Sequence, residues 1–131
     1  MMNLIKLNAS KYTPGVIMDP VNDVIQFTGS SMPENAMDFF FPIIKWAEDY
    51  YNSCNDKAKD KKVLQVTFNL SYQNSASHRA FLELFRVLKK INEKGMKVTV
   101  DWFHERDDEH MLEGGKILSE MSDLNVCFQE V

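Results

Sequence analysis

One stretch of the sequence constrains the fold more than any other: two alternating, strand-like segments with a helical segment between them. Apolar and polar residues alternate over residues 64–70 and again over residues 96–102, which predicts two strands that each bury one face. Between them, apolar residues recur at helical spacing from Ala80 to Ile91, and Gly95 follows as a helix stop. A strand, a connecting helix and a second strand favour parallel pairing in one sheet.

The N-terminal part of the chain has the pattern of a hairpin. Residues 16–18 and 24–27 are β-favouring runs, and the sequence Asp-Pro-Val-Asn-Asp of residues 19–23 lies between them. These five residues favour turns, so the two runs are predicted to pair as antiparallel strands. Residues 4–7 resemble a short edge strand.

The first helix is predicted from its start signal. Ser31 can accept a hydrogen bond as the N-cap, and Glu34 three residues later can close a capping box. The helix is expected to run to about Tyr51, and Pro42 inside it should bend or interrupt it. The polar, Lys-rich residues 52–62 are predicted to form a solvated loop.

Toward the C-terminus, residues 111–121 have the apolar spacing of a short helix, and residues 124–128 alternate as a last strand. The predicted order is therefore strand, strand, helix, strand, helix, strand, helix, strand. We expect one α/β domain over residues 1–131, with two layers. Its sheet should be mixed but mostly parallel, with an N-terminal hairpin and with helices mainly on one face, because the strands bury one face only.

Composition excludes several classes of partner and ligand. The net charge is -4 and the basic residues are dispersed or lie in residues 57–62, so nucleic acid is not an expected partner. No apolar run approaches the roughly 18 residues of a membrane-spanning helix, and the N-terminus lacks a signal-peptide pattern, so we expect a cytoplasmic protein without membrane insertion. Cys54 and Cys127 form no CxxC motif and are expected to be free thiols. No phosphate loop or dinucleotide fingerprint occurs, and no cofactor is expected.

The junction before the central helix is rich in hydroxyl groups. Residues 71–78 read Ser-Tyr-Gln-Asn-Ser-Ala-Ser-His, and Ser75 stands where a helix N-cap belongs. A phosphate on this exposed hydroxyl would lie against the positive end of the helix dipole and its free N–H groups. The sequence therefore predicts a helix cap, and the same position would suit a phosphorylation switch.

Three segments of the chain resemble a known family. Residues 31–35 (Ser-Met-Pro-Glu-Asn) open an aromatic helix, residues 72–77 precede the second helix, and residues 100–103 (Val-Asp-Trp-Phe) lead through an acidic loop to Met-Leu-Glu. From about Thr13 to the C-terminus, the chain is similar to the SiaC-type regulatory phosphoproteins of bacteria. The resemblance implies a fold similar to that of the anti-sigma factor antagonist (STAS) domains.

The resemblance also implies a non-enzymatic signalling switch. A serine/threonine kinase would phosphorylate the protein, a metal-dependent phosphatase would reverse this, and the unmodified form would bind and activate a diguanylate cyclase. Control of cyclic di-GMP, and of biofilm formation or aggregation, would follow. The acceptor in the family is typically a threonine within Asn-Thr-Ser-Ser, and the matching residue here is Ser75, with Ser77 as the remaining alternative nearby.

We expect a partner to dock around the two junctions that match the family. The predicted partner-binding residues are Tyr72, Asn74, Ser77, His78, Pro33, Glu34, Asn35 and Phe40. Phe40 is the middle one of three consecutive phenylalanines, and one helical stripe cannot easily bury all three because successive side chains point in different directions. Trp46 and Tyr50, four residues apart, would extend an aromatic surface on this helix.

Two other interpretations stay open. His104, Asp108 and His110 could serve a small metal-assisted hydrolase, although their spacing does not match the HExxH motif and a solvated acidic loop before a helix also explains them. The other interpretation is an interaction domain without a switch, bound to its partner through the aromatic residues of the first helix. No acid is placed to orient His78, so a Ser–His catalytic pair is not indicated.

Overall fold

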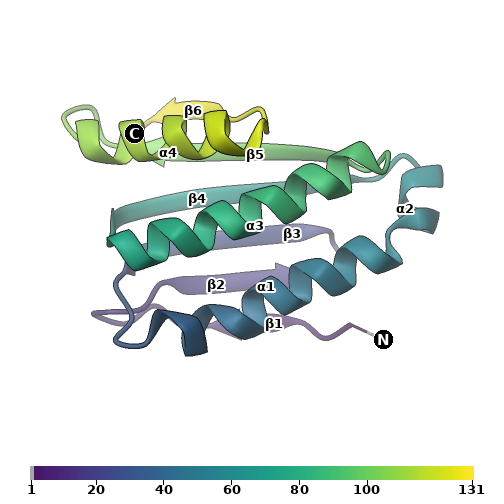
Figure 1. Ribbon diagram of the computed structural model, residues 1–131, viewed down its shortest axis with the longest axis horizontal. Coiled ribbons are helices and arrows are strands. Elements are labelled where there is room, and N and C mark those ends of the chain that lie inside the picture. Colours follow the sequence, from purple (N-terminus) through teal and green to yellow (C-terminus); the bar gives the residue numbers. More distant parts are fainter. Residues whose placement is uncertain (1) are drawn as a thin grey trace.

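Six strands form one sheet, and their order in the sheet equals their order in the chain (Figure 1). The computed structural model describes residues 2–131, apart from the side chains of residues 56 and 58. The strands are β1 (Ile5–Leu7), β2 (Gly15–Asp19), β3 (Val24–Ser31), β4 (Val63–Gln73), β5 (Lys97–His104) and β6 (Cys127–Glu130). The helices are α1 (Ala36–Ser53), α2 (Asn55–Lys59), α3 (Ser75–Glu93) and α4 (Glu109–Ser122).

The sheet is mixed, as the sequence predicts. Strands β1, β2 and β3 pair antiparallel, and β3, β4, β5 and β6 pair parallel. Each parallel connection contains a helix, and crossovers of one hand between strands in sequential order place their helices on the same side. Figure 1 shows α1, α3 and α4 on one side of the sheet, which confirms the predicted two-layer architecture.

This topology brings three strand-to-helix junctions, β3–α1, β4–α3 and β5–α4, to the carboxyl-terminal ends of the parallel strands. The parallel strands β3 and β4 end beside each other, with Ser31 paired to Gln73. The helices α1, α3 and α4 begin after β3, β4 and β5, so their N-termini all lie toward these carboxyl-terminal strand ends. Ligand sites of parallel α/β sheets form at such carboxyl ends of the strands.

Aromatic rings join the central helix to the sheet. The ring of Phe68 on β4 stacks on those of Phe27 and Trp102, with centroids 4.9 Å and 5.1 Å away, and Phe81 of α3 meets it edge-on at 5.2 Å. All four side chains are fully buried. Each such pair contributes about 0.5–1.5 kcal/mol beyond the burial of its area. The core thus fixes α3, and with it the junction that precedes α3.

The first helix differs from the prediction at its start. The N-cap is Asn35, whose side chain accepts from Asp38 N, while Ser31 is the last residue of β3 and is buried. The capping box with Glu34 is therefore wrong, because Ser31 continues the strand pairing. The helix also continues through Pro42, because the rest of α1 keeps a long buried face that outweighs one lost hydrogen bond.

Two other boundaries were predicted wrongly. The segment 52–62 is not a continuous loop, because α1 extends to Ser53 and α2 follows at once. The last strand begins at Cys127 and not at residue 124, since Asp123 adopts a left-handed conformation and buried Leu124 belongs to the connection. Both cysteines are free thiols. Within residues 2–131, no helix is long and apolar enough to cross a membrane.

Candidate functional site

The junction between β4 and α3 is a single residue, Asn74. Its backbone is extended, and its side-chain oxygen accepts a hydrogen bond from Ser77 N over 2.8 Å. Asn74 is therefore the N-cap, and the prediction that Ser75 has this role is wrong by one residue. Asparagine and serine cap helices about equally well, so the two could not be separated by residue type. Ser75 is the first residue of the helix.

The serine hydroxyls of this junction have different environments. Ser71 Oγ lies 2.9 Å from Ser30 Oγ, on the strand side. Ser77 is fully buried, and its hydroxyl donates to the carbonyl oxygen of Ser31 over 3.0 Å. Ser75 is exposed, and its side chain makes no hydrogen bond within residues 2–131. Of these three serines, Ser75 has the accessible and uncommitted hydroxyl.

Ser75 lies at a cleft of about 700 Å³ between the end of β4, the start of α3 and α4. The cleft is lined by Ser71, Tyr72, Gln73, Asn74, Ser75, His78, Arg79, Asp108, His110, Met111, Glu113, Gly114 and Ile117. A cleft of this size lies within the range of about 300–1,000 Å³ that is usual for ligand pockets.

Gly114 brings α4 close to two other residues that line this cleft. A Cβ atom on Gly114 would lie 2.6 Å from Gln73 Nε2 and 3.9 Å from His78 Nδ1, so the missing side chain lets α4 approach both residues. The Gln73 Oε1 atom is buried and has no hydrogen-bond partner among the described residues. Burial lowers the pKa of His78 from its ordinary value of 6.5, so this imidazole is kept neutral near pH 7.

A second hollow of about 590 Å³ lies on the other side of the α3 N-terminus, between α1 and α3. We call it the α1–α3 groove, and its lining residues are Ala36, Met37, Phe40, Phe41, Ile44, Lys45, Glu48, Ala76, Arg79, Ala80 and Glu83. Met37 is 84% exposed and Phe41 is 71% exposed. These two exposed apolar side chains are four positions apart and therefore lie on the same face of α1. Arg79 lines both the groove and the cleft.

Comparison with known proteins places this geometry in a family. The model of the "SiaC family regulatory phosphoprotein" matches residues 7–131. The chain belongs to the SiaC family. This membership confirms the resemblance that the three sequence segments indicate.

Individual known proteins are similar to this chain in sequence or in fold. An uncharacterized protein of Pseudomonas aeruginosa strain UCBPP-PA14 is 24% identical over 112 residues, which are 86% of this chain and 84% of that protein. SiaC of Pseudomonas aeruginosa has a TM-score of 0.81 at 22% identity, with 99% of this chain and 100% of that chain covered. The crystal structure of the diguanylate cyclase SiaD in complex with its activator SiaC, from the same organism, contains a chain with a TM-score of 0.84 at 21% identity. That match covers 97% of this chain and 99% of the other, and the two structural matches show a shared fold.

The predicted partner-binding residues gather at one edge of the sheet but do not all reach the surface. Glu34 and Asn35 are exposed at the start of α1, Tyr72 is 50% exposed, and Asn74 and His78 are half-buried in the cleft. Pro33, Ser77 and Phe40 are buried, although Phe40 also lines the α1–α3 groove, and contact of these three residues with a partner stays a prediction.

The aromatic surface of α1 is also smaller than predicted. Trp46 and Tyr50 are buried and stack on each other with ring centroids 5.3 Å apart. Phe40 is buried as well, whereas Phe41 faces outward and Met37 is exposed one turn earlier. The exposed apolar pair is therefore Met37 and Phe41, and sequence periodicity could have found Met37, which lies four positions before Phe41.

The residues of the hydrolase hypothesis do not converge. Within residues 2–131, no three His, Cys, Asp or Glu side chains form a group able to hold a metal ion. Asp108 is the N-cap of α4, and its carboxylate accepts from Met111 N over 3.0 Å. His104 lies at the end of β5 and its Nδ1 is 3.1 Å from the carbonyl oxygen of Glu105. The geometry therefore does not support this alternative.

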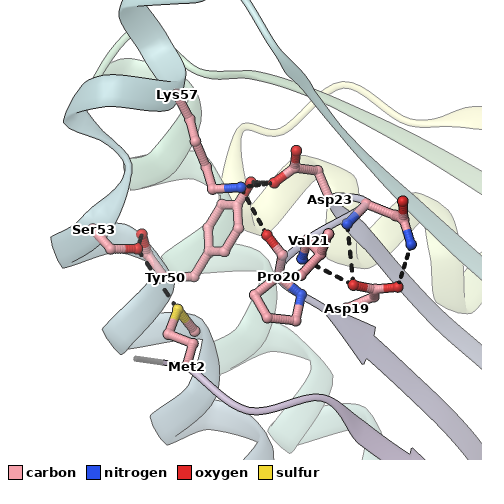
Figure 2. A network of polar contacts seen from close by, with 9 residues as sticks. Met2, Asp19, Pro20, Val21, Asp23, Tyr50, Ser53 and Lys57 are labelled. Atoms are coloured by element: carbon pink, nitrogen blue, oxygen red, sulfur yellow. Dashed lines mark hydrogen bonds and ion pairs between the residues drawn. The ribbon is translucent and has the colours of Figure 1, made fainter.

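Sequence reasoning missed a polar cluster at the opposite end of β3 (Figure 2). Asp23, which is 4% exposed, accepts from the Tyr50 hydroxyl over 2.7 Å and pairs with the Lys57 ammonium. Lys57 also donates to Pro20 O over 2.8 Å. Burial, and then the hydrogen bond to Asp23, raise the pKa of Tyr50 far above its ordinary value. The cluster joins α1 and α2 to the β2–β3 turn, and no local sequence signal pairs residues that are 34 positions apart.

Proposed function

We propose that this chain is a cytoplasmic, non-enzymatic regulator that is reversibly phosphorylated on Ser75 and that binds and activates a diguanylate cyclase when it is unphosphorylated. The observation that carries the proposal is the exposed Ser75 hydroxyl at the mouth of a cleft, free of any capping role. Membership of the SiaC family of regulatory phosphoproteins supports the switch. The complex of the related SiaC with the cyclase SiaD supports the class of partner.

Phosphorylation of Ser75 would leave the fold intact. The hydroxyl is at the first position of α3, and the N-terminal end of a helix favours negative charge. The first turn of α3 has no acidic residue, whereas α1 has Asp38 and α4 has Glu109 in this position. A phosphate of about -1.5 to -2 charge would therefore be accommodated by the helix dipole.

The same phosphate would change what the surface can bind. The cleft already contains Asp108 and Glu113, so the modification makes its charge strongly negative. A partner that fits the neutral hydroxyl loses complementarity and meets new repulsion, because the charge appears inside the contact area. We propose that the cyclase covers this cleft and the adjoining α1–α3 groove, with Met37 and Phe41 as apolar anchors.

The first experiment determines the acceptor. The protein is co-expressed with its cognate serine/threonine kinase and studied by intact mass and peptide mapping, as wild type, Ser75→Ala and Ser77→Ala. The proposal expects one phosphate on wild type and on Ser77→Ala, mapped to Ser75, and none on Ser75→Ala. A metal-dependent phosphatase should remove it. Phosphate that persists on Ser75→Ala would refute Ser75 as the acceptor.

The second experiment tests the partner. Purified cyclase is assayed for cyclic di-GMP synthesis with the unmodified protein, with the kinase-treated protein and with Met37→Ser/Phe41→Ser. Synthesis should rise only with the unmodified wild type, because the modified protein and the double variant lack a complementary surface. Equal stimulation by all three proteins would argue against this docking surface. The downstream expectation is control of biofilm formation or aggregation through cyclic di-GMP.

A further inference from the structure

Arg79 occupies the boundary between the two hollows of the candidate site. Its side chain lines the cleft that contains Ser75 and also the α1–α3 groove that contains Met37 and Phe41. The residue is exposed, and within residues 2–131 it takes part in no ion pair. Its guanidinium is therefore free to turn toward either side of α3.

The spacing of Ser75 and Arg79 suits a pair that forms on phosphorylation. The two residues are four positions apart in one helix, with the future anion on the N-terminal side. This is the better of the two orientations for an ion pair at this spacing. A guanidinium also matches the geometry of phosphate oxygens, with which it can form two parallel hydrogen bonds.

The other titratable groups of the cleft differ from Arg79 in their charge. Among the described residues that line it, Arg79 alone carries a permanent positive charge. Burial lowers the pKa of His78 in the unmodified protein, whereas a phosphate dianion in the same cleft would raise that pKa again, so the charge of this imidazole depends on pH. Asp108 before α4 and Glu113 on α4 are negative and would repel a phosphate, and His110 on α4 is exposed. A phosphate on Ser75 therefore has one permanently charged cation, Arg79, among the described residues of the cleft.

We propose that Arg79 is the residue that responds to the phosphate: it edges the α1–α3 groove in the unmodified protein and turns to the cleft to bind phosphorylated Ser75. This inference rests on the proposed function and adds how the modification reaches the second hollow. The charged residues that line the groove are Lys45, Glu48, Arg79 and Glu83. Withdrawal of Arg79 makes this balanced set net negative, so the groove changes although the phosphate lies outside it.

The test uses phosphoserine that is encoded at position 75 during translation, so it needs no kinase. The second ionisation of the phosphate is followed by ³¹P NMR as a function of pH in wild type, Arg79→Gln and Arg79→Lys. The matched control is Arg86→Gln, because Arg86 is exposed on the same helix and lines neither hollow. An ordinary phosphoserine has this pKa at about 6.

The proposal predicts that the phosphate pKa is lower in wild type than in Arg79→Gln by about one unit. The reason is that the Arg79 guanidinium, four positions along the helix, favours the dianionic form of the phosphate. Arg79→Lys should keep part of the shift, and Arg86→Gln should match wild type. Equal titration of wild type and Arg79→Gln would overturn the role of Arg79. Since the phosphate is encoded, this result is independent of whether a kinase modifies Ser75, and the mapping experiment alone decides that question.

Discussion

The hydroxyl of Ser31 donates a hydrogen bond of 2.8 Å to the hydroxyl of Ser77, 46 positions later in the chain. Ser77 Oγ in turn donates to the Ser31 carbonyl oxygen over 3.0 Å, and Asn74 N donates to the same oxygen over 2.9 Å. Both serines are fully buried. These bonds join the end of β3 to the first turn of α3, so Ser75 is presented on a turn that the sheet holds in place.

Replacement of Ser77 by alanine should destabilise the fold. The change leaves the buried Ser31 hydroxyl without its acceptor, which costs about 1–3 kcal/mol. Urea unfolding measures this loss, and Ser31→Ala/Ser77→Ala should lose less than the sum of the two single variants because the pair is coupled. Strict additivity of the two changes would contradict the pairing.

Replacement of Ser75 should leave stability nearly unchanged, whereas replacement of its neighbour should not. Asn74 caps α3 through Ser77 N, so Asn74→Ala is expected to lose about 1 kcal/mol of unfolding free energy. Ser75→Ala removes a hydroxyl that makes no hydrogen bond in the part of the chain that the structure describes. Thermal unfolding of both variants distinguishes the roles. A larger loss for Ser75→Ala than for Asn74→Ala would assign the cap to Ser75 after all.

The two adjacent glycines of α4 should respond oppositely to alanine. A Cβ on Gly115 would lie 2.7 Å from Nε1 of buried Trp102, whose indole is held by a bond to Met111 O, so overpacking of about 1–3 kcal/mol is expected. The one close contact of a Cβ on Gly114 is with the end of the flexible Gln73 side chain, since His78 Nδ1 is at the ordinary contact distance of 3.9 Å. Gly114→Ala should therefore keep or gain stability, by up to about 1 kcal/mol of helix propensity.

Partner binding should not follow the order of the two stabilities. Gly114→Ala places a methyl group in the floor of the cleft beside His78, so it should weaken partner binding in a well-folded protein. Calorimetric unfolding and a binding titration on the same samples compare the two effects. Full binding by Gly114→Ala would show that the partner does not use the cleft floor.

The buried Tyr50 should make stability fall in alkaline solution. Its pKa is raised above the ordinary 10.0 in the folded protein, so above pH 10 the unfolded chain releases a proton that the folded chain keeps. Tyr50→Phe should cost about 1–2 kcal/mol at pH 7, through loss of the bond to Asp23. Above pH 10 the gap between wild type and Tyr50→Phe should narrow by about 1.4 kcal/mol per pH unit. A constant gap from pH 7 to 11 would contradict the burial of this hydroxyl.

The fold was largely accessible from sequence because its signals are local. The alternation in β4 and β5, the helical spacing in α3 and Gly95 after it each follow from a few neighbouring residues. The predictions were wrong where contacts between residues far apart in the chain determine the local structure. Ser31 resembles a helix cap in isolation, but its pairing with Gln73 across the sheet keeps it in β3. Lys57 resembles a solvated loop residue, but its contact with Asp23 ties α2 to a turn far away in the chain.

The candidate site was accessible only in part for the same reason. Ser75, Asn74 and His78 belong to one segment, and their proximity needs no tertiary information. The rest of the site depends on how α3 packs against its neighbours. Packing decides that α4 lines the cleft, that Gly114 lies close to Gln73, and that Arg79 lies between the two hollows. The burial of Ser77 has the same origin, and it removes the alternative acceptor from the surface.

The most direct test of the switch is the affinity of the cognate diguanylate cyclase for two forms of this protein, unmodified and with phosphoserine encoded at position 75. Isothermal titration calorimetry at one salt concentration gives both dissociation constants. We expect the unmodified form to bind and the phosphorylated form to bind with an affinity lower by about tenfold or more, at least 1.4 kcal/mol. Equal affinities of the two forms would contradict control by Ser75 phosphorylation.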